Sequence, residues 1–228
     1  MGGVGIFRET DCLASARYDG PANHDSVTLF EMLERALAQS QLALSDIELY
    51  AVANGPGSFT GIRVGLAAAR AWGKVFGKPV RSVSILAALV GKANVTTDWA
   101  FPILDGRRGE FFLGCFRRIT GAGSGADRTK YEPADAGWVL NPDLVRAFLE
   151  ERLADGADAT CLARAHDSAA LALCESLPCA GRQCIEGTLM DSIAAIALRE
   201  ERASVPQSDA QLDAYYIRRP EAEVKWKA

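Results

Sequence analysis

The chain has 228 residues, of which 49% are hydrophobic and 24% are charged, and its formal net charge is −4. These values are typical of a globular protein and exclude a disordered or collagen-like chain. The acidic balance also argues against a broad basic face that would grip nucleic acid by itself. The longest uncharged apolar run, 82–91, is about half as long as a membrane-spanning helix, so we expect no membrane contact.

The six cysteines are spread along the chain without a Cys-x-x-Cys pair. A chain of this length can bury a sizeable core and does not need disulfide bonds. We therefore expect reduced thiols that act as small hydrophobic side chains in a cytoplasmic protein. The spacing of cysteines and histidines also predicts no metal site.

The first half of the chain predicts an alternation of strands and helices. The helix expected at 23–41 has apolar residues over about 220° of its circumference, whereas one buried face explains a narrower stripe. The excess indicates a second partner for this helix, inside the fold or on another chain. The other elements expected here are strands at 4–8, 12–18, 47–54 and 80–83 and helices at 60–76 and 84–93.

Polar residues 94–98 mark a domain junction, and a second mixed set of elements follows. Within it, Asn141-Pro142-Asp143 is a strong start signal for a helix. This organisation predicts an α/β protein in two lobes, 1–97 and 98–203, with the tail 204–228 packed on the first. The other expected elements are a hairpin of 100–104 and 110–117, a flexible stretch at 121–130, a strand at 159–163 and helices at 168–176 and 188–203.

The most informative segment is the glycine-rich turn between the strand at 47–54 and the helix at 60–76. Backbone N–H groups and the helix dipole at such a turn suit a phosphate or a carboxylate. The pattern is neither a Walker loop nor Gly-x-Gly-x-x-Gly, and a tight turn without a ligand is the interpretation that the local residues favour. The residues of the candidate phosphate-binding turn are Gly55, Gly57, Ser58, Thr60 and Arg63.

The helix at 60–76 also carries a stripe without large side chains, because Gly61, Gly65, Ala69 and Gly73 recur every four residues. Three glycines cost about 2–3 kcal/mol of helix propensity relative to alanine. Close approach of another element would offset that cost. The partner is either another chain or part of the same lobe, and the spacing alone does not choose between them.

Several motifs resemble the bacterial TsaB family of tRNA threonylcarbamoyladenosine biosynthesis proteins. Residues 55–65, GPGSFTGIRVG, resemble its signature, and His24 resembles its His-Ser helix start. Residues 105–110, DGRRGE, resemble its Asp-Ala-Arg-Arg-Gly-Glu hairpin, and 216–218 resemble its closing Pro-x-Tyr-Leu-Arg with Ala214 in place of the proline. The resemblance spans 24–218 and implies the two-lobed actin-like, Hsp70-like and ribonuclease-H-like α/β fold of the glycoprotease-like branch.

The resemblance implies a non-catalytic scaffold subunit that dimerises with the threonylcarbamoyltransferase TsaD. The ATPase TsaE would join them, and the complex would modify the adenosine beside the tRNA anticodon. The chain would need no cofactor of its own, although the complex uses ATP, and it would meet tRNA only through the complex. Pairing with itself when alone stays open. The expected partner interface consists of Leu29, Phe30, Leu33, Leu37, Gly61, Gly65, Ala69 and Gly73.

One feature departs from the family pattern. The family's first strand ends in Asp-Thr-Ser, whereas this chain starts at Met1-Gly2-Gly3-Val4, where the second strand would begin. We therefore expect the first strand to be missing from the N-terminal lobe, because the sheet is built without it or because the true start lies upstream.

An enzyme of the same superfamily, a nucleotide-binding kinase or a metalloprotease-like protein, is the alternative function. Two features speak against it: the strand that would hold Mg²⁺ has no counterpart, and His24 and His166 do not form a metal-binding pair. The arginine-rich hairpin is interpreted as a salt-bridged turn, with a tRNA-binding patch as the alternative. Its residues are Asp105, Arg107, Arg108 and Glu110.

Overall fold

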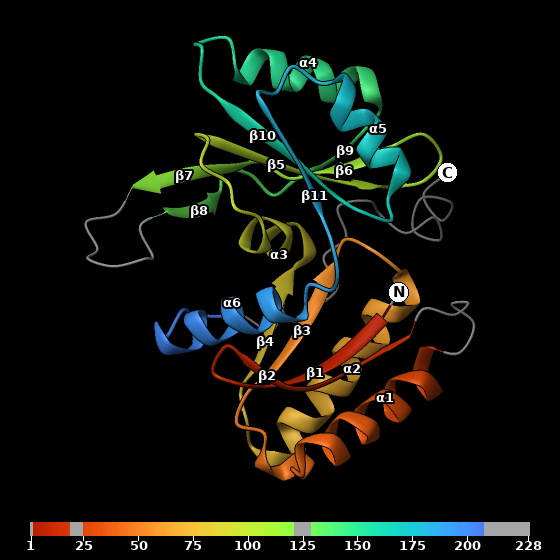
Figure 1. Ribbon diagram of the computed structural model, residues 1–228. Helices are drawn as coiled ribbons and strands as arrows, with labels where there is room; N and C mark the ends of the chain where they lie inside the picture. The colour runs from red at the N-terminus through yellow and green to blue at the C-terminus, as the bar shows by residue number, and fades with distance from the viewer. Residues whose placement is uncertain (1, 19–24, 121–128, 208–228) are drawn as a thin grey trace, which may run out of the picture. The chain divides into compact units, whose positions relative to one another are not determined.

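The computed structural model describes residues 2–18, 25–120 and 129–207, and the chain divides into two units (Figure 1). The first unit holds the described residues up to 88 and those from 188 to 207, and the second holds those from 89 to 187. The expected flexible stretch at 121–130 falls almost entirely outside the described residues, as do His24 and the motif at 214–218.

The first unit is built from two pairs of strands and three long helices (Figure 1). The strands are β1 (Gly2–Arg8), β2 (Asp11–Tyr18), β3 (Tyr50–Gly55) and β4 (Val80–Ser84). The helices are α1 (Asp25–Ser40), α2 (Phe59–Phe76) and α6 (Met190–Arg202), and a short 3-10 helix, η2, spans Leu44–Asp46.

The two strand pairs of the first unit form separate sheets. Strands β1 and β2 make an antiparallel hairpin, and β3 and β4 make a parallel pair. Among the described residues no strand joins β1 to β3. Helix α1 covers the hairpin, α2 covers the parallel pair, and α6 contacts β1, β3 and β4. Helix packing therefore holds the two pairs together.

The second unit is a mixed sheet with helices packed against it. Its strand order is β11-β10-β5-β6-β9, and β7 joins β5 to β8. The core lies between this sheet and two helices, where Phe101, Ile103 and Leu113 of the strands meet Val145 and Leu149 of α4. The elements are β5 (Trp99–Asp105), β6 (Phe111–Leu113), β7 (Phe116–Thr120), β8 (Thr129–Pro133), β9 (Trp138–Leu140), β10 (Ala159–Arg164), β11 (Gly181–Ile185), α4 (Pro142–Arg152) and α5 (Ser168–Ser176). Helix α3 (Ile85–Lys92) crosses the boundary between the units.

The division into units differs from the expected lobes at the C-terminal end. Helix α6 belongs to the first unit, whereas the sequence analysis placed 188–203 with the second lobe. Ser192 of α6 donates a hydrogen bond to the carbonyl oxygen of Ala88 at 2.7 Å, and Arg81 of β4 forms an ion pair with Glu201 at 2.6 Å. Because these contacts join residues far apart in the sequence, the residues of the helix alone do not predict which unit it packs against.

Several elements differ in detail from their expected bounds. The strand expected at 110–117 is interrupted, because the Gly114 N–H donates to the carbonyl oxygen of Pro102 at 2.9 Å and separates β6 from β7. The strand expected from residue 47 starts at Tyr50, after η2. Strands β8, β9 and β11 were not expected. No helix of the described residues is both long and apolar enough to cross a membrane.

Four of the six cysteines are buried, and Cys12 and Cys184 are exposed. Burial raises the pKa of the Cys115 thiol to about 11. The Cys161 thiol donates to the Cys179 sulfur at 2.9 Å, and both lie in the core of the second unit. The buried thiols therefore serve as small core side chains.

We expect a thiol reagent at neutral pH to label Cys12 and Cys184 rapidly and the other cysteines only as the chain unfolds. The measurement is the time course of labelling in native and in denaturing buffer. The control is the Cys12→Ser/Cys184→Ser variant, in which the fast phase should vanish. A fast phase that survives in this variant would contradict the placement of the buried thiols.

Candidate functional site

The glycine-rich turn leads from β3 directly into α2. Gly55 has a φ of +119°, which side chains rarely tolerate, and the peptide bond to Pro56 is cis. Ser58 is the N-cap, and its hydroxyl oxygen accepts a hydrogen bond from the Gly61 N–H at 3.2 Å. Serine and threonine are both common at this position, and the cap is Ser58 and not Thr60.

Arg63 stands one turn into α2 and is engaged locally. Its guanidinium carbon lies 3.9 Å from the centroid of the exposed Phe59 ring. This stacking is a cation–π contact and holds the guanidinium beside the turn. The turn presents Gly57, Thr60 and Arg63 at the surface, and a phosphate at this turn remains a prediction.

The glycine stripe of α2 faces the sheet of its own unit. A Cβ atom at Gly73 would lie 2.3 Å from Cγ2 of Val80 and 3.0 Å from the carbonyl oxygen of Lys78. A Cβ atom at Gly65 would lie 3.4 Å from Cγ2 of Val52, and Ala69 is only 4% exposed. The close approach that offsets the cost of these glycines is therefore with β3 and β4, the same-lobe alternative that the spacing left open.

The apolar arc of α1 is largely covered as well. Leu33 is buried, and Leu37 packs against the small core of Ile6 and Ala14 on the hairpin. Phe30 is the exception, with 52% of its surface exposed and its ring 6.4 Å from that of Trp72 on α2, edge to face. Of the eight expected interface residues, only Phe30 is exposed, and the other seven are buried or half-buried in the first unit.

Three apolar residues that the sequence analysis did not name are exposed on α2, in addition to Phe30 on α1. Val75 of α2 is 73% exposed, and Ala67 and Ala71 precede it at four-residue spacing and are also exposed. We call Phe30, Ala67, Ala71 and Val75 the α1–α2 face. Small exposed side chains on a helix let another helix approach closely. The sequence analysis missed this second stripe, although its spacing is as regular as that of the glycines.

The arginine-rich hairpin is a tightly bonded turn. The Asp105 carboxylate accepts a hydrogen bond from the Arg107 N–H at 2.7 Å, and the Gly106 N–H donates to the Glu110 carbonyl oxygen at 2.8 Å. Arg107, Arg108 and Gly109 all have φ near +60° to +76°. The Asp105 carboxylate thus supports an unusual backbone path, which favours the structural interpretation of this turn over a tRNA-binding patch.

Metal ligands do not gather in the described parts of the chain. Within 2–18, 25–120 and 129–207, no group of three or more His, Cys, Asp or Glu side chains is arranged to hold a metal ion. The Asn54 side chain at the end of β3 donates to the Ser82 hydroxyl at 3.2 Å, and its own oxygen is buried without a hydrogen-bond partner there.

Comparison with known proteins finds similarity to proteins of tRNA threonylcarbamoylation. A family model for TsaD, tRNA N6-adenosine threonylcarbamoyltransferase, matches residues 21–132. The tRNA threonylcarbamoyladenosine biosynthesis protein TsaB of Bacillus subtilis is 29% identical over 119 residues, which cover 52% of each chain. Over about half of its length, the chain is therefore similar to TsaB. An uncharacterized protein of Mycobacterium leprae is 34% identical over 140 residues, 59% of this chain and 37% of that protein.

A solved structure extends the likeness over nearly the whole chain. YeaZ from Pseudomonas aeruginosa superimposes with a TM-score of 0.67 at 23% identity, covering 92% of both chains. This likeness confirms the expected actin-like and Hsp70-like fold. The matched region spans about half or less of the length of the curated relatives named above. The fold, in contrast, is shared with YeaZ over 92% of both chains.

Replacing Ser58 by alanine should lower the free energy of unfolding by about 1 kcal/mol, because the Gly61 N–H loses its acceptor. Thr60→Ala is the matched control, since the cap is made by Ser58, and it should change stability by less than about 0.5 kcal/mol. Chemical denaturation of the two variants measures both values. A larger loss in Thr60→Ala than in Ser58→Ala would reverse the assignment of the cap.

Gly73→Ala should lower the free energy of unfolding by about 1–3 kcal/mol, because the added Cβ collides with Val80. The gain in helix propensity, about 1 kcal/mol, opposes this loss without cancelling it. In a double-mutant cycle, Val80→Ala should relieve part of the strain, so that the double variant is more stable than the sum of the single losses predicts. Strict additivity would show that α2 does not approach β4 at this point.

Proposed function

We propose that this chain is a non-catalytic subunit of a complex that attaches a threonylcarbamoyl group to tRNA. Its role is to bind a TsaD-type threonylcarbamoyltransferase, with a TsaE-type ATPase as the third member. The observation that carries the proposal is the exposed α1–α2 face on a chain similar to TsaB. The ATP that the complex consumes would be bound and hydrolysed by the partners.

The composition of the α1–α2 face supports a helix as the docking element. Phe30 and Val75 are large apolar side chains that remain 52% and 73% exposed. Full burial of a side chain of this kind stabilises by about 1.5–3 kcal/mol, so a partner that covers both gains a substantial part of its affinity there. Ala67 and Ala71 precede Val75 on α2 at four-residue spacing and keep the helix surface flat.

The same face explains how self-association and partner binding would relate. A second copy of this chain would cover the same apolar residues that TsaD covers, since both associations bury exposed hydrophobic surface. Homodimer and heterodimer would therefore exclude one another. A homodimer of the isolated chain would be a reservoir that releases monomers to bind the transferase.

An aspartate at Phe30 or Val75 should weaken binding to the cognate TsaD at least about tenfold, because a carboxylate would be buried without a partner. Leu144→Asp is the matched control: Leu144 is 53% exposed on α4 of the second unit. Isothermal titration calorimetry gives the three dissociation constants, and circular dichroism verifies folding. Equal binding by folded Phe30→Asp, Val75→Asp and Leu144→Asp variants would rule out this face as the interface.

The proposed function itself is tested by reconstitution. TsaD and TsaE should modify an unmodified tRNA transcript at least about tenfold faster when this chain is added, and the chain alone should neither modify tRNA nor hydrolyse ATP. The alternative, a nucleotide-dependent enzyme, predicts ATP hydrolysis by the isolated chain that Asp105→Ala abolishes. Modification at an unchanged rate without the chain would refute the subunit role.

A further inference from the structure

The charge of this chain is unevenly distributed. The segment 49–97 contains six of the 25 basic side chains and none of the 29 acidic ones, although the chain as a whole has a net charge of −4. Most of this segment forms β3, α2 and β4. The net acidity of the chain therefore conceals a basic region in the first unit, and charge asymmetry of this kind is a signature of polyanion binding.

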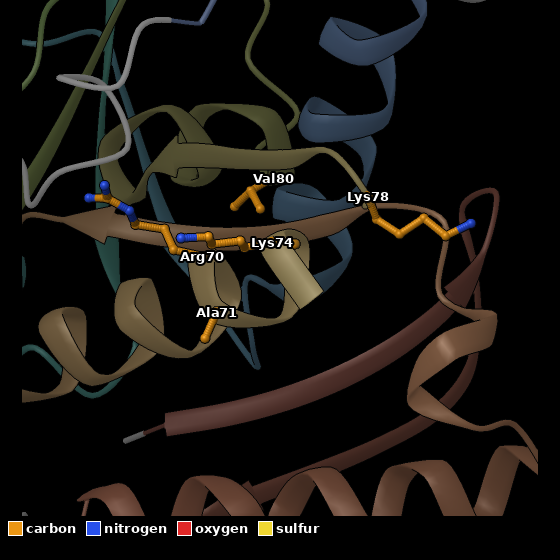
Figure 2. A pocket seen from close by; sticks show the side chains of 6 residues that line it. Arg70, Ala71, Lys74, Lys78 and Val80 are labelled. Atoms are coloured by element: carbon orange, nitrogen blue, oxygen red, sulfur yellow. The ribbon is translucent and has the colours of Figure 1, made fainter. Parts of the chain in front are cut away.

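Three of these cations surround a groove between the C-terminal half of α2 and the start of β4. The groove has a volume of about 450 Å³ and is lined by Arg70, Ala71, Gly73, Lys74, Lys78 and Val80 (Figure 2). Gly73 is the reason for its shape, because the absent side chain brings α2 close to Val80 and leaves long cationic side chains to border the hollow. We call Arg70, Lys74 and Lys78 the basic edge.

The charges of the basic edge have no counter-ion among residues 2–18, 25–120 and 129–207. Arg70, Lys74 and Lys78 make no ion pair or side-chain hydrogen bond with any residue that the structure describes. Arg81, on the adjoining strand, behaves differently: it pairs with Glu201 and also donates to the carbonyl oxygen of Val205 at 2.6 Å. Cations without internal partners are available to an external anion.

The directions of the three side chains indicate the shape of that anion. Figure 2 shows the Arg70 and Lys74 side chains extending the same way from α2, whereas Lys78 extends toward the opposite end of the groove. Arg70 and Lys74 are four residues apart, about 6 Å along the helix axis. Because the three charges form a row and do not converge on one point, they suit an extended polyanion better than a single phosphate.

The α2 cations of the basic edge lie on a different side of that helix from the large apolar side chains of the α1–α2 face. At 100° per residue, Arg70 and Lys74 lie about 140° and 100° around α2 from Val75. Trp72, which contacts Phe30 of α1, is on the far side of the helix from Arg70. Ala71 belongs to the α1–α2 face and also lines the groove, so the two surfaces adjoin along α2.

We propose that the basic edge binds the phosphodiester backbone of the tRNA that the complex modifies. The identity of the RNA rests on the proposed function, while the polyanion chemistry rests on the groove itself. Binding would be independent of base sequence, because lysine and arginine contacts to phosphates position a nucleic acid without reading it. This chain would then hold the tRNA directly, in addition to any contact made through its partner.

The test is fluorescence anisotropy of a labelled, unmodified tRNA transcript titrated with the full chain at several salt concentrations. Arg70→Ala/Lys74→Ala/Lys78→Ala should weaken binding at least about tenfold and reduce the slope of log K against log salt by about 2–3. The control, Arg17→Ala/Arg35→Ala/Arg199→Ala, removes three exposed cations of the same unit and the same total charge. It should bind within about twofold of the wild type.

Three outcomes would overturn the inference: equal weakening in the two triple variants, no tRNA binding by the wild type, or a labelled polyglutamate peptide bound as tightly as tRNA. If thermal unfolding shows that the first variant is unfolded, Lys74→Glu and Lys78→Glu replace it as single charge reversals. Titration of TsaD onto the same variants separates this inference from the proposed function. A triple variant that loses tRNA binding but still binds TsaD supports the basic edge. A wild-type chain that binds tRNA but does not bind TsaD refutes only the subunit role.

Discussion

Helix α2 lies so close to β3 and β4 that only a glycine fits at its point of closest approach, Gly73 against Val80. The helix gives up about 1 kcal/mol of propensity at each glycine, and the packing of its stripe on the strands offsets this cost. The first unit depends on that contact, since its hairpin and its parallel pair share no hydrogen-bonded strand among the described residues. Helices α1, α2 and α6 supply the connection that a continuous sheet would otherwise provide.

The orientation of α2 on the sheet decides what its other sides can do. With the glycine stripe turned inward, Ala67, Ala71 and Val75 are exposed, and Arg70 and Lys74 border the groove toward β4. One helix thus has a packing side, an apolar side and a basic side. The proposed role of this chain as a docking subunit of a tRNA-modifying complex uses both the second and the third side.

Local signals were predictable from the sequence, and long-range packing was not. Ser58 and Asn141 cap their helices as their side chains suggest, and the glycine stripe was found. The sequence did not show which element the glycine stripe packs against, because the same spacing suits a partner chain or a neighbouring strand. The position of Val80 beside Gly73 shows that it is a strand of the same unit. The contacts of α6 with Ala88 and Arg81 join residues more than 100 positions apart, and no local pattern encodes them.

The central claim is that the outward side of α1 and α2 is a partner surface while their inward side is structural. Hydrogen–deuterium exchange of the chain, alone and with an excess of TsaD, addresses it most directly. The account predicts that added protection upon binding concentrates in peptides from 25–40 and 59–76, with exchange in α4 and α5 of the second unit unchanged. Protection confined to the second unit, or none in either helix, would contradict the account.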